Sequence, residues 1–138
     1  MQRLFSYTKN MKLFTKLTEC INTFLPDTPM VIESILEKEL RVFLEASGFT
    51  VSRQVTKKKD RYDLLCRDGN ELVCIELKKH ADISDIKQFD KYLPKFKDGL
   101  IVVCWQVSGS VREIFAEVVK QSPIPLCLIE LSKKYSLA

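Results

Sequence analysis

Apolar side chains recur along this chain with two different periods, and the period changes from segment to segment. A spacing of three or four positions, typical of the buried face of a helix, is found over residues 8–25, 29–47, 83–96 and 108–121. Alternating or continuous apolar runs, typical of strands, cover residues 49–55, 61–79, 100–105 and 126–131. The resulting order, α-α-β-β-β-α-β-α-β, predicts an α/β protein with a central mixed β-sheet flanked by helices.

Two prolines separate the first predicted helix from the second. Pro26 and Pro29 flank Asp27-Thr28, where Thr28 is placed to cap the second helix and Pro29 suits its first position. Gly48 comes directly after that helix, and a left-handed glycine commonly ends a helix. We therefore expect an N-terminal helical extension over residues 1–28, used for packing or dimerisation, and one domain over residues 29–138.

The segment RYDLLCRDGNELVCIELKK, residues 61–79, predicts a β-hairpin with a definite register. Gly69-Asn70 suits a tight two-residue turn between the two apolar runs. That turn places Leu64 opposite Ile75, and the neighbouring pairs on this side of the hairpin are also apolar. This side is therefore expected to face the core.

The other side of the hairpin carries Asp63 directly opposite Glu76, with Lys78 two residues further on. Opposed side chains have Cβ atoms roughly 5 Å apart, and like charges in that position are destabilising. Such charges can simply be solvated, but apolar residues share this face, so we expect it to be covered. A hard divalent cation with oxygen ligands, and the lysine ammonium beside it, would make the closeness of the acids tolerable.

Composition fits a single globular domain. The chain has 138 residues, of which 46% are hydrophobic and 29% charged, enough for a core without disulfides. No apolar run approaches the roughly 20 residues of a membrane span, and no secretory signal pattern is present. A cytoplasmic protein is expected.

Cysteine and histidine usage restricts the chemistry. Five cysteines form no CxxC pair and lie mostly in apolar strand patterns, so they are expected to be buried small hydrophobes rather than zinc ligands. His80 is the only histidine. Histidine-rich metal sites are thereby excluded.

Basic residues flank the hairpin although the net charge is only +4. Such runs are commonly solvated loops, but beside an acidic metal site they favour phosphate binding. We expect contacts to a nucleic-acid backbone from Lys57, Lys58, Lys59, Arg61, Lys79 and His80.

Two helices carry further polar candidates. Glu33 and Glu37 lie one turn apart at the edge of the apolar stripe of the second helix, where an acid is either solvated or an additional metal ligand. Gln88 and Tyr92 lie one turn apart on the next helix.

These residues and the order of elements resemble the PD-(D/E)XK nuclease superfamily over about residues 32–131. That superfamily joins a strand aspartate to Glu-x-Lys on the next strand, which corresponds here to Asp63, Glu76 and Lys78. The resemblance implies a restriction-endonuclease-like fold. Tyr62 stands where the superfamily name has proline.

Three branches of the superfamily are similar to this chain. The stretch EKELRVFLEASGF resembles archaeal Holliday-junction resolvases, in which a helix glutamate near Glu37 joins the metal ligands, although the Ser-Gly loop of resolvases is missing. Gln88 and Tyr92 resemble the Gln-xxx-Tyr of RecB-type nucleases. The hairpin continuing to DGLIVVC resembles the C-terminal nuclease domain of archaeal mismatch and flap endonucleases.

The resemblance implies a Mg²⁺-dependent endonuclease, with Mn²⁺ as a substitute, that cuts DNA by structure rather than by sequence. It implies metal ligation by Asp63, Glu76, the main-chain carbonyl of Leu77 and Glu37 or Glu33. Lys78 would orient or deprotonate the attacking water, and Gln88 and Tyr92 would position the nucleophile or a phosphate. A noncatalytic nucleic-acid-binding module and an RNA-processing nuclease are the alternatives. One site per chain makes a homodimer the expectation for cutting both strands.

Overall fold

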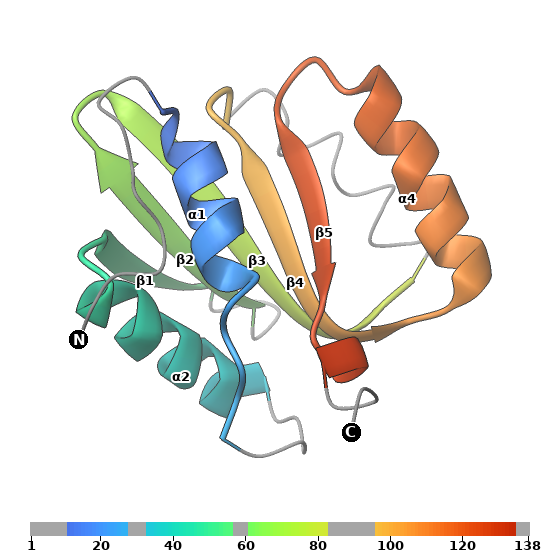
Figure 1. Cartoon of the computed structure of the whole chain (residues 1–138), viewed down its shortest axis with the longest axis horizontal. Coiled ribbons are helices and arrows are strands. Elements are labelled where there is room, and N and C mark those ends of the chain that lie inside the picture. Colours follow the sequence, from blue (N-terminus) through green and yellow to red (C-terminus); the bar gives the residue numbers. More distant parts are fainter. Residues whose placement is uncertain (1–10, 28–32, 57–60, 83–95, 135–138) are drawn as a thin grey trace.

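A five-stranded mixed sheet forms the centre of the computed structural model, which describes residues 11–27, 33–56, 61–82 and 96–134. The side chains of residues 54–56, 61–63 and 134 are not among those described. The strands lie in the order β1 to β5 across the sheet (Figure 1). Their bounds are Thr50–Thr56, Arg61–Asp68, Glu71–Ala81, Leu100–Val107 and Leu126–Glu130. β1, β2 and β3 are antiparallel neighbours, whereas β3, β4 and β5 are parallel.

Helices flank this sheet, so the predicted α/β class with a mixed sheet is confirmed and agrees with a restriction-endonuclease-like fold. The helices are α1 (Leu13–Ile21), α2 (Glu33–Ala46) and α4 (Gly109–Gln121), with a short 3₁₀ helix, η1 (Ser132–Lys134), after β5. The helix predicted over residues 83–96 falls almost wholly outside the described residues, and so do Thr28 and Pro29. Gly48, after α2, has φ of 100°, as its predicted left-handed role requires.

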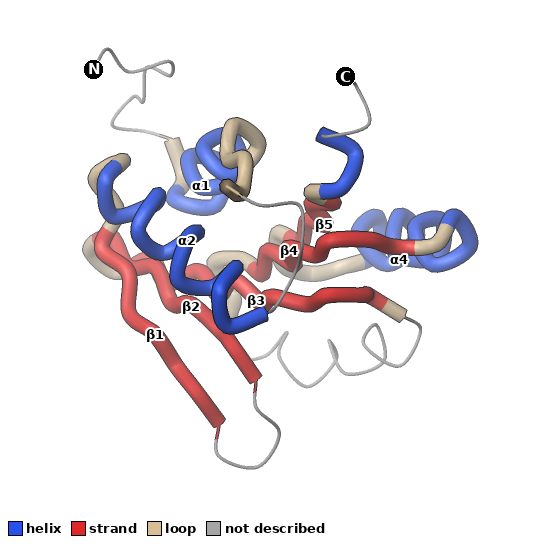
Figure 2. Tube along the Cα trace, turned by 90° about the horizontal axis from the view of Figure 1, so that it is seen from below, coloured by secondary structure: helices blue, strands red, loops and turns tan. Residues whose placement is uncertain are grey.

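α1 and α2 cover one face of the sheet together (Figures 1 and 2). The buried side chains of α1 are Leu13, Leu17, Cys20 and Ile21, and none is more than 4% exposed. They share one core with Leu36, Leu40 and Leu44 of α2 and with Leu64, Cys66, Val73 and Ile75 of the hairpin. The apolar face of α1 is therefore used for packing within the chain.

α4 packs on the opposite face through Val111 and Phe115, which join the strand residues Val102, Cys104 and Leu126 in a second cluster. Its first turn is capped by Ser108, whose hydroxyl accepts a hydrogen bond from the amide of Val111 at 3.3 Å. The sheet is thus covered on both faces, as parallel strands require.

The turn end of the β2–β3 hairpin is held by several polar contacts. Glu71 Oε2 accepts a hydrogen bond from the first amide of α1, Leu13 N, at 3.2 Å, and Asp98 Oδ2 accepts one from Leu72 N at 2.9 Å. Lys16 Nζ lies 3.6 Å from Asp68 Oδ2. These contacts tie the hairpin turn to α1 and to the loop before β4.

All five cysteines are free thiols, as expected. Cys20, Cys66, Cys74 and Cys104 are buried, and Cys127 is half-buried. Burial, with a smaller contribution from nearby Cys20, raises the pKa of Cys66 from 9.0 to about 12. Among the residues described, no helix has the length and apolar character needed to cross a membrane.

Candidate functional site

The predicted register of the hairpin is confirmed. Leu64 pairs with Ile75, and Asp63 pairs with Glu76. The apolar side of the hairpin faces α1 and α2, as expected. Asp63 and Glu76 form the last pair between β2 and β3.

The two strands separate beyond this pair. Within the described part of the chain, residues of β2 before Asp63 pair with β1, and residues of β3 after Glu76 pair with β4. Figure 2 shows β1 and β2 running away from β3 and β4. The two acidic positions therefore stand at a fork in the sheet.

Backbone hydrogen bonds define how these strands face each other. Cys74 N donates to Gly99 O at the start of β4, and since strand backbone groups alternate in direction, those of Glu76 also point toward β4. Asp63 and Glu76 are thus a non-hydrogen-bonded antiparallel pair, the kind in which Cα atoms are only about 4.5 Å apart. The backbone groups of Leu77 point in the opposite direction to those of Glu76. The carbonyl oxygen of Leu77 is therefore directed to the other edge of β3, where the pairing with β2 has ended.

Glu76 is 3% exposed and is one of two buried charged side chains in the part of the chain that the structure describes. Its β4 neighbour is Val102, and that of Lys78 is Cys104. Because Val102 and Cys104 both belong to the cluster under α4, Glu76 and Lys78 lie on that face of the sheet. Lys78 is half-buried. The carboxylate and the amine are thus neighbours on one partly covered face.

Glu33, in the first turn of α2, reaches the same part of β3. Its Oε1 accepts a hydrogen bond from the amide of Lys79 at 2.8 Å. The backbone groups of Lys79 point in the same direction as those of Leu77, two residues earlier. The Lys79 amide therefore lies on the edge of β3 that faces the fork. The Glu33 carboxylate is therefore bound to the main chain one residue after Lys78. The sequence had favoured Glu37 as the helix carboxylate near the site.

Glu37, the other buried charged side chain, is 1% exposed. Its Oε1 lies 3.2 Å from Arg53 Nε on β1 and 3.5 Å from Arg41 Nε one turn along α2. Both arginines are partly exposed, while the carboxylate is enclosed. In the described contacts, Glu37 joins α2 to the outer strand β1.

The other predicted site residues divide into three groups. Lys79 and His80 are exposed at the end of β3. Asp63 and Arg61 lie on β2, but their side chains are outside the described part. Lys57, Lys58, Lys59, Gln88 and Tyr92 also fall outside the described residues. Among the side chains that are described, no three His, Cys, Asp or Glu residues gather as metal ligands.

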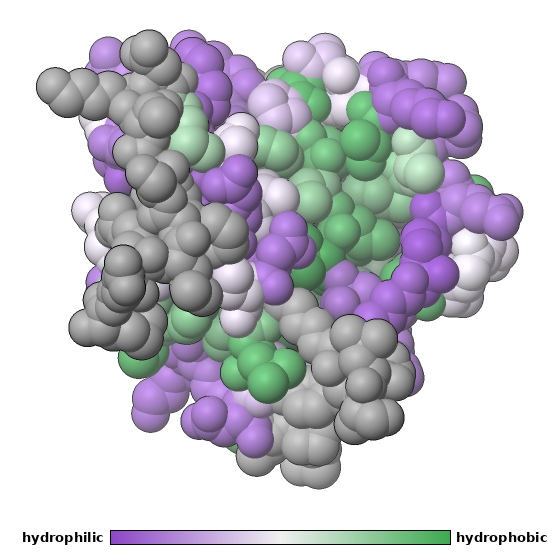
Figure 3. All heavy atoms as spheres, in the orientation of Figure 1, coloured by the Kyte–Doolittle hydropathy of each residue, from purple (hydrophilic) through white to green (hydrophobic). Residues whose placement is uncertain are grey.

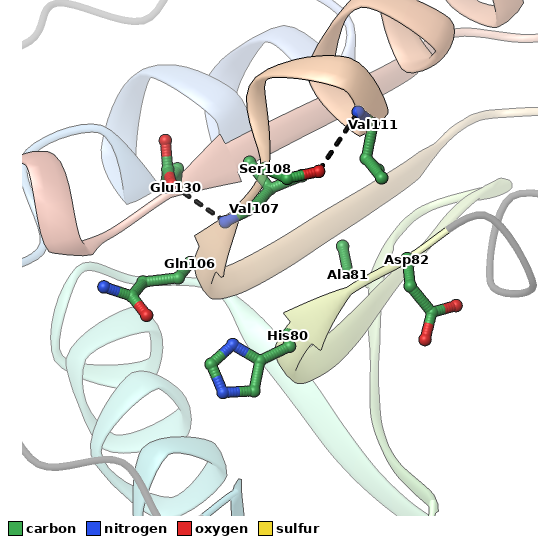
Figure 4. A pocket seen from close by; sticks show the side chains of 8 residues that line it. All are labelled: His80, Ala81, Asp82, Gln106, Val107, Ser108, Val111 and Glu130. Carbon is green, nitrogen blue, oxygen red and sulfur yellow. Dashed lines mark hydrogen bonds between the residues drawn. The ribbon is translucent and has the colours of Figure 1, made fainter.

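A pocket of about 420 Å³ lies where β3 and β4 end and α4 begins (Figure 4). His80 and Gln106 project from neighbouring strands, while Ser108, which caps α4, and Val111 of α4 line another part of the pocket. Glu130, whose Oε2 accepts a hydrogen bond from Val107 N at 2.9 Å, also lines the pocket. Sequence patterns did not single out Gln106 or Ser108, although Ser108 could have been recognised as a helix cap.

The chain is similar to a known protein family. The family model described as the endonuclease NucS C-terminal domain matches residues 33–126, more than half of the sequence. The match includes Glu33, both strands of the hairpin and the start of β5. No curated protein sequence matches the chain. The family match indicates a nuclease-related, DNA-binding role.

Proposed function

This chain belongs to the endonuclease NucS C-terminal domain family, within the restriction-endonuclease-like superfamily, and on that premise we propose that it is a metal-dependent endonuclease that hydrolyses DNA phosphodiester bonds. The observation that carries the proposal is the position of the Asp63–Glu76 pair, the last before β2 and β3 separate. Lys78 comes two residues after Glu76 on the same face of β3. This is the arrangement that opposed acids would need in order to share a cation.

The donor atoms at the fork suit a hard divalent cation. Glu76 offers a carboxylate with 3% exposure, Leu77 offers a carbonyl directed to the open edge, and Asp63 stands opposite. All are oxygen ligands of the kind that Mg²⁺ and Mn²⁺ accept. Asp63, Glu76 and the Leu77 carbonyl would hold the ion, which when bound would act as a Lewis acid and lower the pKa of a coordinated water.

We assign the helix carboxylate at this site to Glu33, with Glu37 retained as the alternative that the sequence favoured. Glu33 already contacts the main chain of Lys79, and it would position the Leu77–Lys79 segment or a water beside the ion. Glu37 is engaged by Arg53 and Arg41. Its ion pairs would fix α2 against β1.

Lys78 would orient or deprotonate the attacking water and offset negative charge that develops on the phosphate. The lysine is half-buried beside Glu76, which restricts the positions that its amine can reach. Gln88 and Tyr92, predicted from the sequence, would position the nucleophile or the phosphate. Each of these roles acts at a phosphodiester and needs no base contact.

The exposed Lys79 and His80 would bind the DNA backbone next to the cleaved bond, together with Lys57, Lys58, Lys59 and Arg61. Phosphate contacts of this kind fix the position of the duplex without reading its sequence. Recognition would then depend on DNA structure. We expect binding that weakens steeply with salt, because each phosphate contact releases counterions.

The test is a cleavage assay of the full chain on linear, mismatched, flapped and branched DNA, with Mg²⁺, with Mn²⁺ and with EDTA. We expect metal-dependent cleavage of at least one structured substrate. Glu76→Gln and Lys78→Met should abolish cleavage while DNA binding persists. Metal-independent cleavage, or full activity in Glu76→Gln, would overturn the proposal.

The same assay separates the two alternatives. A noncatalytic DNA-binding module would bind without cutting under every metal condition, and an RNA-processing nuclease would cut matched RNA in preference to DNA.

A further inference from the structure

The pairing of β3 with β4 is interrupted just after Lys78. The register is continuous as far as Lys78 and Cys104, omits the next position on each strand, and resumes at His80 and Gln106. Bulges and similar interruptions re-aim side chains and are over-represented beside active sites. The two strands are thus divided into a regular part, which carries Glu76 and Lys78, and an end part, which carries His80 and Gln106.

The buried positions change across this interruption. Before it, even-numbered positions such as Cys104 pack in the cluster under α4, whereas after it Ala81 and Val107 belong to that cluster. Successive side chains of a strand point to opposite faces. His80 and Gln106 are therefore directed away from α4, as Figure 4 shows, and both are exposed. The interruption places an imidazole and a carboxamide side by side on the surface.

Two carboxylates from other elements hold the main chain beside this exposed pair. Glu33 Oε1 of α2 accepts a hydrogen bond from Lys79 N at 2.8 Å, and Glu130 Oε2 of β5 accepts one from Val107 N at 2.9 Å. The Glu130 side chain is only 10% exposed, and its other oxygen lies 2.7 Å from Arg112 Nη2 of α4. The strand ends are therefore fixed from three sides, which is the preorganisation that a recognition site needs.

The pocket at these strand ends is polar, and its charged lining residues are acidic. Asp82 and Glu130 line it beside His80 and Gln106, and no lysine or arginine of the described residues does. It differs in this respect from the apolar area over β5 that Figure 3 shows between α1 and α4. Carboxylates repel a phosphate. The lining therefore suits an uncharged polar ligand that carries N–H donors.

A nucleobase has this chemistry. The Gln106 side chain offers a donor and an acceptor in one plane, the arrangement that binds adenine through its N6 and N7 atoms. Asp82 adds a second acceptor for the amino group of the base. Guanine and thymine present carbonyl oxygens at the corresponding edge, and these would face the Asp82 carboxylate unfavourably.

We propose that Gln106 recognises one base of the DNA strand next to the cleaved bond and that it prefers adenine, with Asp82 as the supporting acceptor. The inference rests on the proposed nuclease site, because His80 and Gln106 follow Lys78 and its β4 neighbour by two residues, roughly 7 Å along the strands. It goes beyond that site by adding a base contact to contacts that are otherwise made to the DNA backbone.

The first test measures binding without cleavage. Trp105 is the only tryptophan of the chain, and it is half-buried directly before Gln106, so its fluorescence reports on ligands at this position. The full chain is titrated in EDTA with short homopolymers of deoxyadenylate, deoxycytidylate and deoxythymidylate. We expect oligo(dA) to bind about tenfold more tightly than oligo(dT), the discrimination typical of a bidentate base contact. Equal affinity for all three homopolymers would overturn the proposal.

Two variants of Gln106 separate base recognition from a structural role. Gln106→Leu should lower the affinity for oligo(dA) about tenfold and leave that for oligo(dT) unchanged. Gln106→Glu has only acceptors, so it should transfer the preference to oligo(dC), because cytosine donates from its N4 amino group. Equal loss of affinity for all three homopolymers in both variants would show that Gln106 is structural and would overturn the proposal.

Gln121→Leu is the matched control. Gln121 is the last residue of α4 and is exposed, whereas the pocket lies at the first turn of that helix. The preference for oligo(dA) should persist in this variant. Thermal melting confirms that each variant is folded. A preference that is lost in Gln121→Leu and kept in Gln106→Leu would contradict the assignment.

The second test compares cleavage rates on substrates that carry each base, paired or unpaired, at successive positions beside the cut. The parent should cleave fastest with adenine at one of these positions, and Gln106→Leu should lose that preference without a slower rate on the thymine substrate. A preference that survives Gln106→Leu would overturn the proposal. If no substrate is cut, the proposed nuclease function fails, and the homopolymer affinities still decide the role of Gln106.

Discussion

The two ends of the β2–β3 hairpin carry similar residues in opposite circumstances. At the turn end, Glu71 accepts the amide of Leu13 and Asp98 accepts that of Leu72. At the other end, Asp63 and Glu76 are paired across the strands just where the strands part. Acids near the turn accept hydrogen bonds from backbone amides, whereas the two acids at the fork occupy directly opposed positions.

This difference shows how a hairpin can hold an unfavourable pair in place. Contacts of the turn with α1 and the loop before β4 fix the register, and a slip by one residue would send every side chain to the other face. Packing of Leu64 and Ile75 against α1 and α2 adds to the same constraint. The turn end therefore determines which residues meet at the fork.

Replacing the same residue type at both ends of β3 tests this comparison most strongly. Glu76→Ala should lower the DNA cleavage rate about a thousandfold, since it removes a proposed metal ligand worth several kcal/mol in the transition state. Its free energy of unfolding should change far less than its cleavage rate, because a like-charge repulsion is removed together with the polar contact of the Glu76 side chain.

Glu71→Ala is the matched control on that strand. It should keep cleavage within about twofold and lose about 1 kcal/mol of stability, the usual net value of one hydrogen bond. Cleavage rates and urea denaturation measure both variants. Equal cleavage by the two would remove the functional distinction between the ends.

Gly99→Ala, next to the turn end of the hairpin, should lower the free energy of unfolding by about 3 kcal/mol. Gly99 has φ of 138°, and an added Cβ would overlap Cδ1 of Phe14 on α1, so backbone strain and overpacking combine. Gly69→Ala, in the turn itself with φ of 60° and nothing within 4 Å, should cost only about 1 kcal/mol. Thermal or urea unfolding of the two variants compares them directly, and equal losses would show that α1 does not press on this loop.

The two glutamates of α2 distinguish structure from function. Glu37→Ala should cost about 2 kcal/mol of stability, because it leaves Arg41 and Arg53 without their buried partner; their partial exposure keeps the loss below that of a fully buried pair. Cleavage per folded molecule should change little.

Glu33→Ala should affect cleavage more than stability. The cleavage rate should fall about tenfold or more, because the main chain at Lys79 loses its hydrogen bond to the Glu33 carboxylate. Its stability should stay within about 1 kcal/mol of the parent. Single-turnover cleavage and chemical denaturation of both variants provide the comparison. If Glu37→Ala alone lost cleavage while remaining folded, Glu37 would be the site carboxylate.

The smallest effect concerns Cys66, between the two ends of β2. Burial raises the pKa of its thiol from 9.0 to about 12. Its contribution to stability is therefore fully present below pH 9 and is lost as pH rises toward 12, because the unfolded thiol ionises first. The slope should be roughly 1 kcal/mol per pH unit.

Cys66→Ala provides the reference for this pH dependence. The difference in unfolding free energy between parent and variant, measured by urea denaturation from about pH 7 to 11, should be constant below pH 9 and shrink above it. A difference that stays constant over the whole range would contradict the burial argument.

Local sequence patterns were sufficient to predict the mixed sheet, the register of the hairpin and the burial of most cysteines. Gly69-Asn70 fixes the turn, and period-two alternation then determines that Asp63 opposes Glu76, because both depend on neighbours close in sequence. The same patterns could not decide between Glu33 and Glu37 as the helix carboxylate of the site. Helical period places both acids at the edge of one stripe, and it cannot tell which turn of α2 will lie beside Lys79.

The amino-acid sequence by itself determined an α/β protein with two acids and a lysine side by side, since strand alternation and turn chemistry are short-range properties. Only the tertiary structure decided where β2 and β3 part, that Arg53 on a distant strand engages Glu37, and that β5 is the last strand of the described sheet. These features depend on the packing of segments far apart in sequence. Burial against such partners is a property of the assembled fold, and no local period encodes it.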